Sequence, residues 1–296
     1  MTKRELKQRA GKALKLLSPC RVCPRQCGVD RLKKKPGKLG FCRTGREAII
    51  SSYHPHHGEE RCLSGRAGSG TIFFSSCNLA CVYCQNWEIS QLRLGKPVTA
   101  EVLGQMMLDL QNQGCHNINF VSPTIWVPQI LEALVIAREK GLKLPLVYNT
   151  GGYDAVESLK LLEGVIDIYM PDIKYADSKI ALKYSLVPNY WSVVRKAVKE
   201  MHRQVGNLVI DKQSLAQKGL LIRHLVLPGG LAGTDKVMEF LAQKISKNTY
   251  VNLMDQYHPS NKASRYSEIN RRITDKEFKE ALALAKGAGL HRFDKR

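Results

Sequence analysis

Short apolar runs rich in β-branched and aromatic residues alternate with amphipathic stretches along the chain after residue 70. The apolar runs have the length of buried strands, and they lie at 71–76, 117–122, 144–150, 165–172, 221–228 and 250–255. Apolar residues recur at helical spacing over 99–113, 127–140, 154–162, about 177–204, 234–246 and 274–288. Thr99, Asp154 and Thr274, which are typical helix-capping residues, each open one of these stretches. The alternation predicts parallel strands joined by right-handed crossovers.

The predicted elements indicate an α/β fold built around one barrel-type domain. Six strand–helix units are too few to close an eight-stranded barrel, so we expect a partial (β/α)6 TIM-type barrel over residues 67–296. Residues 1–66 are expected to form a small basic, cysteine-rich extension. A doubly wound sheet is the alternative. In either fold, functional residues gather where strands end and loops begin.

Composition limits the class of protein. The 296 residues are 44% hydrophobic, which is enough for one barrel-sized domain with a small appendage. The chain shows neither a run of about 18 apolar residues nor an N-terminal signal segment with an apolar core. We therefore expect a cytoplasmic protein that does not enter a membrane.

The net charge of +20 is concentrated near the N-terminus, where residues 1–50 carry 15 Lys and Arg against 3 Asp and Glu. A basic face of this kind attracts nucleic acid, anionic substrates or an acidic protein partner. A solvated basic surface without any ligand explains the same charge equally well. No nucleic-acid-binding motif accompanies it.

The nine cysteines favour metal binding over disulfide bonds, because their number is odd and seven of them lie in or beside two tight groups. In "CNLACVYC", Cys77, Cys81 and Cys84 leave the strand predicted at 71–76, which places them at the barrel mouth. Three thiolates can hold three irons of a cubane cluster and leave the fourth iron for another ligand. A structural zinc loop is the alternative.

The Cys-x3-Cys-x-aromatic-Cys spacing resembles that of the radical S-adenosylmethionine (SAM) superfamily. The longer stretch "GSGTIFFSSCNLACVYCQNWEIS" is most similar to pyruvate formate-lyase activating enzyme-like proteins, in the branch with a cysteine-rich segment before the radical motif. The resemblance covers residues from about 20 to 290. It implies an oxidoreductase in which Cys77, Cys81 and Cys84 are catalytic ligands of a 4Fe–4S cluster. An electron from that cluster would cleave SAM to methionine and a 5′-deoxyadenosyl radical.

The same resemblance implies a set of cofactor-binding residues. Tyr83 is expected against the adenine, and Asp172 and Lys174 of "MPDIKY" resemble an Asp-x-Lys pair that contacts the cofactor and holds a cation or charge pair. The stretch "VSPT" replaces the Gly-Gly-Glu of many family members, so Ser122, Pro123 and Thr124 are expected near the methionyl amino group. A structural role is equally expected for His258. The remaining expected cofactor-binding residues are Ser122, Pro123, Thr124, Asn149, Arg223 and His258.

A second group of cysteines, Cys20, Cys23, Cys27 and Cys42, supplies four thiols just upstream of the barrel. Four thiolates complete a closed site for zinc or for a second iron–sulfur cluster, and unrelated reduced cysteines are the third reading. We expect this segment to be a metallated lid beside the barrel mouth, and a structural clip at the far end is the alternative. Cys62 is an extra thiol near either site, and Cys115 is expected in the core.

The sequence does not identify the substrate that the radical attacks. The resemblance implies hydrogen abstraction from a backbone glycine of a partner enzyme, with electrons from a flavodoxin or ferredoxin. Modification of RNA or of a small anionic metabolite is an alternative within the enzymes. A non-catalytic, zinc-stabilised binding protein is the alternative of another class, and it predicts tetrahedral zinc with no cofactor binding.

Overall fold

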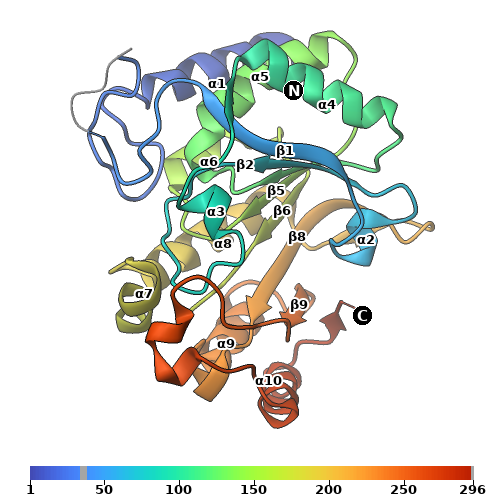
Figure 1. The fold of residues 1–296 in the computed structure, drawn as a ribbon. Coiled ribbons are helices and arrows are strands. Elements are labelled where there is room, and N and C mark those ends of the chain that lie inside the picture. The colour runs from blue at the N-terminus through green and yellow to red at the C-terminus, as the bar shows by residue number, and fades with distance from the viewer. Residues whose placement is uncertain (34–38, 295–296) are drawn as a thin grey trace.

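The computed structural model describes residues 1–33 and 39–294. Its strands are β1 Ala48–His56, β2 Ser69–Phe74, β3 Lys96–Val98, β4 Ile118–Val121, β5 Leu146–Thr150, β6 Ile168–Pro171, β7 Val209–Ile210, β8 Ala216–Leu225, β9 Tyr250–Met254 and β10 Arg292–Phe293. They form one sheet in the order β10-β9-β8-β6-β5-β4-β2-β1-β3, and β7 pairs with β8 (Figure 1).

The helices lie between and around these strands. They are α1 Lys3–Lys15, α2 Arg61–Ser64, α3 Trp87–Ser90, α4 Ala100–Asn112, α5 Val127–Glu139, α6 Val156–Leu161, α7 Ser178–Ser185, α8 Tyr190–Val205, α9 Thr234–Lys244 and α10 Asp275–Gly287. Short 3-10 turns occur at Thr124–Trp126, Pro228–Gly230, Ala263–Arg265 and Ser267–Ile269.

The six predicted strands correspond to β2, β4, β5, β6, β8 and β9, and neighbouring members of this series pair in parallel. Every residue of β5 and β6 is buried, as expected for strands that are covered on both faces. The sheet does not close on itself, because β10 and β3 lie at its two ends. The prediction of a partial (β/α)6 barrel is therefore confirmed.

The N-terminal residues add elements that the prediction did not contain. α1 begins with a capping box between Thr2 and Glu5 and packs on α5, and β1 pairs antiparallel with β2. Because β1 runs against the barrel strands, its last residue His56 lies opposite Ser69, the first residue of β2. The chain that follows β1 therefore starts at the N-terminal end of the barrel strands. The domain boundary after residue 66 stays a prediction.

Two of the predicted helical features are wrong. The helix predicted over about 177–204 is two helices, α7 and α8, separated by Leu186 in the left-handed region (φ 54°) and by Pro188. Asp154 does not cap α6, whose N-cap is Ala155. The buried Asp154 carboxylate instead accepts hydrogen bonds from Thr124, Thr150 and Tyr148 at 2.7–2.8 Å, and so ties the ends of β4 and β5 together.

Candidate active site

Cys77, Cys81 and Cys84 lie in the loop that leaves β2, and all three line one cavity of about 650 Å³, called here the central cavity. The loop is fixed by backbone hydrogen bonds to the end of α7, from Ala80 N to Ser185 O (3.2 Å) and from Val82 N to Tyr184 O (2.8 Å). The prediction that these cysteines stand at the C-terminal end of the first barrel strand agrees with this placement.

Each of the three sulfur atoms has a hydrogen-bonding neighbour. Leu79 N donates to Cys77 Sγ (3.3 Å), Ser185 Oγ donates to Cys81 Sγ (3.0 Å), and Cys84 Sγ lies 3.3 Å from Ser90 Oγ. Donors of this kind stabilise thiolates that bind a metal.

Burial raises the pKa of the Cys77 thiol to about 12, and burial also raises the pKa of Cys81. Buried thiols of this kind are neutral unless a metal cation takes the place of the protons. Three soft sulfur ligands at one cavity therefore suit an iron–sulfur cluster that keeps one iron open. Within the described residues, no group of three or more His, Cys, Asp or Glu side chains converges on a single metal ion.

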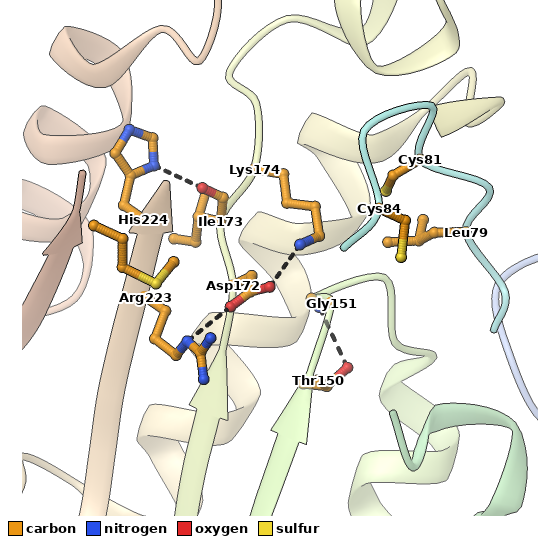
Figure 2. Close-up of polar contacts among 12 residues, drawn as sticks. Leu79, Cys81, Cys84, Thr150, Gly151, Asp172, Ile173, Lys174, Arg223 and His224 are labelled. Carbon is orange, nitrogen blue, oxygen red and sulfur yellow. Dashed lines mark hydrogen bonds and ion pairs between the residues drawn. The ribbon is translucent and has the colours of Figure 1, made fainter. Parts of the chain in front are cut away.

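Asp172 and Lys174 form a largely buried ion pair beside this loop, with Lys174 Nζ 2.6 Å from Asp172 Oδ2 (Figure 2). Arg223 approaches the other oxygen of Asp172, with Nε 3.3 Å from Oδ1. Burial opposes ionisation of Asp172, but the two cations outweigh it and hold the pKa of this carboxyl below its ordinary value. Asp172 is therefore a carboxylate, and all three side chains line the central cavity.

His224 and Tyr190 hold the Asp-x-Lys pair in place, and neither was predicted. His224 Nδ1 lies 2.6 Å from the carbonyl oxygen of Ile173, the residue between the paired side chains (Figure 2). The other ring nitrogen of His224, Nε2, lies 3.0 Å from Thr234 Oγ1. Burial lowers the pKa of His224 to about 4, so the ring is neutral. The Tyr190 hydroxyl accepts from Lys174 N (2.9 Å) and lies within hydrogen-bonding distance of Asp172 O (3.0 Å).

Two further carboxylates, Glu59 and Glu60, line the same cavity from the segment between β1 and α2. Arg223 NH1 lies 3.3 Å from Glu59 Oε2, and Asn252 Nδ2 donates to Glu60 Oε1 (2.8 Å). Glu60 Oε2 is buried and has no hydrogen-bond partner. Burial raises the pKa of Glu59 to about 7. Sequence reasoning missed this pair because its place depends on the antiparallel β1.

Acidic residues outnumber basic residues in the lining of the central cavity, whereas basic residues predominate in the chain as a whole. Its lining includes Glu59, Glu60, Asp172, Asp255 and Asp294 against Arg61, Lys174 and Arg223, in a protein whose net charge is +20. An acidic cavity inside a basic protein favours ligands with a positive charge.

The expected cofactor-binding residues divide into two groups. Ser122, which directly follows β4 and has a φ of 60°, and Asn149 of β5 line the central cavity together with Asp172, Lys174 and Arg223. The described residues that line the cavity do not include Tyr83, Pro123, Thr124 or His258.

Three of these four side chains make other contacts within the protein. Tyr83 is buried, its hydroxyl bonds to Tyr175 (2.5 Å), and its ring packs on Tyr257. Thr124 is held by Asp154, and His258 Nδ1 lies 3.2 Å from Gln256 O. Their contacts with a cofactor stay predictions.

Cys20, Cys23, Cys27 and Cys42 line a separate small recess together with Asn78, the residue after Cys77. The four cysteines thus lie beside the Cys77 loop, which is the position expected for the lid and not for a clip at the far end. Its use as a lid stays a prediction. Cys62 and Cys115 are buried, and neither contributes to the lining of the central cavity or of this recess. The described helices include none that could cross a membrane.

Sequence comparisons agree with the chemistry of the Cys77–Cys84 loop. A model of the radical SAM superfamily matches residues 71–212. The uncharacterized protein MJ0674 of Methanocaldococcus jannaschii is 34% identical over 287 residues, which cover 94% of this chain and 77% of that protein. The uncharacterized protein MJ0808 of the same organism is 26% identical over 171 residues, or 52% of this chain and 49% of that protein.

Solved structures share the fold at low sequence identity. SuiB of Streptococcus suis, solved with its precursor peptide SuiA, superposes with a TM-score of 0.52 at 14% identity over 76% of this chain and 48% of that chain. The FeFe-hydrogenase maturase HydG of Carboxydothermus hydrogenoformans gives 0.52 at 12% identity, with coverages of 74% and 51%. The protein anSMEcpe, solved with bound AdoMet, gives 0.50 at 15% identity, with coverages of 74% and 61%.

This chain spans less than two thirds of each of these three solved chains. The shared fold, the match over residues 71–212 and the three cysteines at one cavity agree with one another. The chain belongs to the radical SAM superfamily, and its family implies a 4Fe–4S cluster and SAM as cofactors.

Proposed function

We propose that this chain uses a 4Fe–4S cluster and SAM in the central cavity to abstract a hydrogen atom from a substrate. The observation that carries the proposal is that Cys77, Cys81 and Cys84 share one cavity with the largely buried Lys174–Asp172 ion pair. Once a cluster and SAM are bound and one electron is supplied, they yield methionine and a 5′-deoxyadenosyl radical.

The residues of the chain have distinct tasks in this proposal. Cys77, Cys81 and Cys84 would hold the cluster through three thiolates, and the iron without a protein ligand would supply a binding site for SAM. Lys174 offers an ammonium to an anionic group, and the ionised Asp172 offers a carboxylate to an amino group. Ser122 and Asn149 add polar groups from the neighbouring strand ends. The cavity walls keep water away from the reacting atoms.

We further propose that the hydrogen comes from a backbone glycine of a partner protein, as in glycyl-radical activating enzymes. The support is the Asp-x-Lys arrangement of Asp172 and Lys174 after β6, which resembles that of such enzymes. The basic residues among positions 1–50 offer a surface for an acidic partner or for a flavodoxin or ferredoxin that donates the electron.

A small molecule with an ammonium or guanidinium group is the second candidate substrate. The observation in its favour is the acidic lining of the central cavity, above all Glu59 and Glu60. A cavity of about 650 Å³ falls in the usual range for small-molecule sites. The anionic metabolite expected as an alternative from the sequence is disfavoured by the same carboxylates.

A fractionated extract separates the two candidates. Extract of the source cells, grown in deuterated medium, is divided by ultrafiltration and added to the reduced protein with unlabelled SAM. The glycyl-radical activating role is supported if two results occur together. Deuterium appears in 5′-deoxyadenosine only with the macromolecular fraction, and the electron paramagnetic resonance (EPR) spectrum shows a glycine-centred radical. Deuterium only with the small-molecule fraction supports the second candidate and contradicts the first. Deuterium with neither fraction contradicts both.

A further inference from the structure

The segment from Cys20 to Cys42 brings four thiols to one recess outside the central cavity. Backbone hydrogen bonds fold its first part tightly: Cys20 N donates to Val29 O (2.8 Å), Gly28 N to Cys20 O (3.0 Å), and Gln26 N to Cys23 O (3.0 Å). The left-handed conformations of Gln26 (φ 42°) and Gly28 (φ 67°) turn the chain on both sides of Cys27. Cysteines that are close in the sequence are therefore also close in space.

The four cysteines line one and the same recess. All four cysteines are free of disulfide bonds. A Cβ added at Gly40 would lie 3.3 Å from Cys27 Sγ, so the glycine allows the backbone to approach this sulfur closely.

The site is also sheltered. Cys20 and Cys23 are 7% and 8% exposed, and Phe41 and Ile125 complete its lining with other apolar groups. Only Cys27 is exposed. Four soft ligands in a largely apolar recess suit zinc or an iron–sulfur cluster. A single zinc ion requires sulfurs on one tetrahedron, whereas in a 4Fe–4S cluster each thiolate binds a different iron, so the sulfurs stand farther apart.

We propose that Cys20, Cys23, Cys27 and Cys42 bind a second iron–sulfur cluster beside the radical SAM cluster. The four sulfurs share one recess although they do not converge on a single-ion site, and this combination favours the cluster over zinc. Because four cysteines ligate all four irons, this second cluster has no open iron and does not bind SAM.

Arg25 joins the two cysteine sites. Its Nε donates to the carbonyl oxygen of Asn78 (2.7 Å), its NH2 donates to Leu186 O (2.8 Å), and its guanidinium lies 3.3 Å from the centre of the Phe41 ring. Asn78 follows Cys77 and itself lines the four-cysteine recess. Arg25 also lines the recess with the four cysteines, so one cation lies between the two groups of cysteines.

Metal analysis of the full-length protein tests the proposal. Iron, sulfide and zinc are measured after anaerobic reconstitution of the wild-type chain, of the triple variant Cys77→Ala/Cys81→Ala/Cys84→Ala, and of the quadruple variant Cys20→Ala/Cys23→Ala/Cys27→Ala/Cys42→Ala. Each variant is expected to keep about four irons and about four sulfides, and the wild type about twice as many. Cys115→Ala, which lies outside both sites, should match the wild type. A triple variant with stoichiometric zinc, or with no metal, would overturn the proposal.

Spectroscopy of the wild-type protein keeps the test independent of how the variants fold. Two EPR signals are expected on reduction, and addition of SAM should change one of them and leave the other unchanged. A single cluster signal, or two signals that both respond to SAM, would contradict a second cluster with four cysteine ligands. Two signals without SAM cleavage would leave the second cluster supported while contradicting the proposed function.

Discussion

Lys174 Nζ lies 2.6 Å from Asp172 Oδ2, and both side chains are 17% exposed. They point the same way because a single residue separates them on extended chain, and His224 holds the carbonyl of that residue. Arg223 neutralises the other oxygen of Asp172. The arrangement presents one ammonium and one carboxylate to the cavity that the three cysteines share.

Removal of the negative charge in Asp172→Asn is expected to weaken SAM binding at least about tenfold. The substitution leaves Lys174 and Arg223 without their shared carboxylate in a largely buried position. The loss of one partner costs about 3–5 kcal/mol in a fully buried pair, and less here because water still reaches these side chains. SAM affinity is measured by equilibrium dialysis on the reconstituted protein. The control is Glu280→Gln, which removes half of an exposed pair with Lys276 (3.9 Å). Unchanged affinity in Asp172→Asn would contradict the assigned role.

Glu59 is expected to make the protein less stable as the pH rises. Burial raises the pKa of this carboxyl from 4.5 to about 7, so the folded state binds the proton more tightly than the unfolded state does. This contribution to stability is complete below the unfolded pKa and is lost as the pH rises from about 4.5 to about 7. The shift corresponds to about 3 kcal/mol.

Urea unfolding at about pH 5 and about pH 8 measures this effect. The variant Glu59→Gln keeps the side-chain shape without a titrating proton, and its free energy of unfolding should fall less than that of the wild type between the two pH values. The exposed Glu280→Gln should behave like the wild type. An identical pH dependence in wild type and Glu59→Gln would contradict the prediction.

Gly152→Ala is expected to destabilise the protein by about 2–4 kcal/mol. Gly152 has a φ of 78°, and an added Cβ would overlap the carbonyl oxygen of Asp172 and press on Tyr190. Because Asp172 would be displaced, SAM affinity should fall as well. Thermal unfolding and dialysis measure the two effects. The matched control is Gly11→Ala inside α1, where nothing lies within 4 Å and alanine should be neutral or stabilising.

The pattern of apolar and polar residues predicted the barrel strands because each strand is a buried apolar run with a clear end. The same pattern did not predict elements whose sequences are weakly apolar or that form only by pairing with a distant segment. β1 reads "AIISSYHPH", is largely exposed after Ile50, and becomes a strand by pairing with β2. The break between α7 and α8 did have a local signal, Pro188, which helices rarely tolerate in their interior.

The candidate site was predictable where a motif marks it. Cys77, Cys81, Cys84, Asp172 and Lys174 all line the central cavity. Asp172 is the last residue of a predicted strand, and the other four residues follow the end of one. The sequence could not reveal Glu59 and Glu60, because they come from the other end of the sheet and enter through β1. Similarly, the buried neutral His224 looks like an ordinary strand residue until its bond to Ile173 is seen.

The formation of 5′-deoxyadenosine by the reduced protein tests the central claim most directly. The wild-type chain is reconstituted anaerobically with iron and sulfide, reduced with dithionite and incubated with SAM, and the products are quantified by chromatography. The account predicts slow formation of 5′-deoxyadenosine and methionine in equal amounts by the wild type and by Cys115→Ala, and none by Cys77→Ala/Cys81→Ala/Cys84→Ala. Equal formation by the wild type and the triple variant, or none by a wild type that contains the cluster, would contradict it.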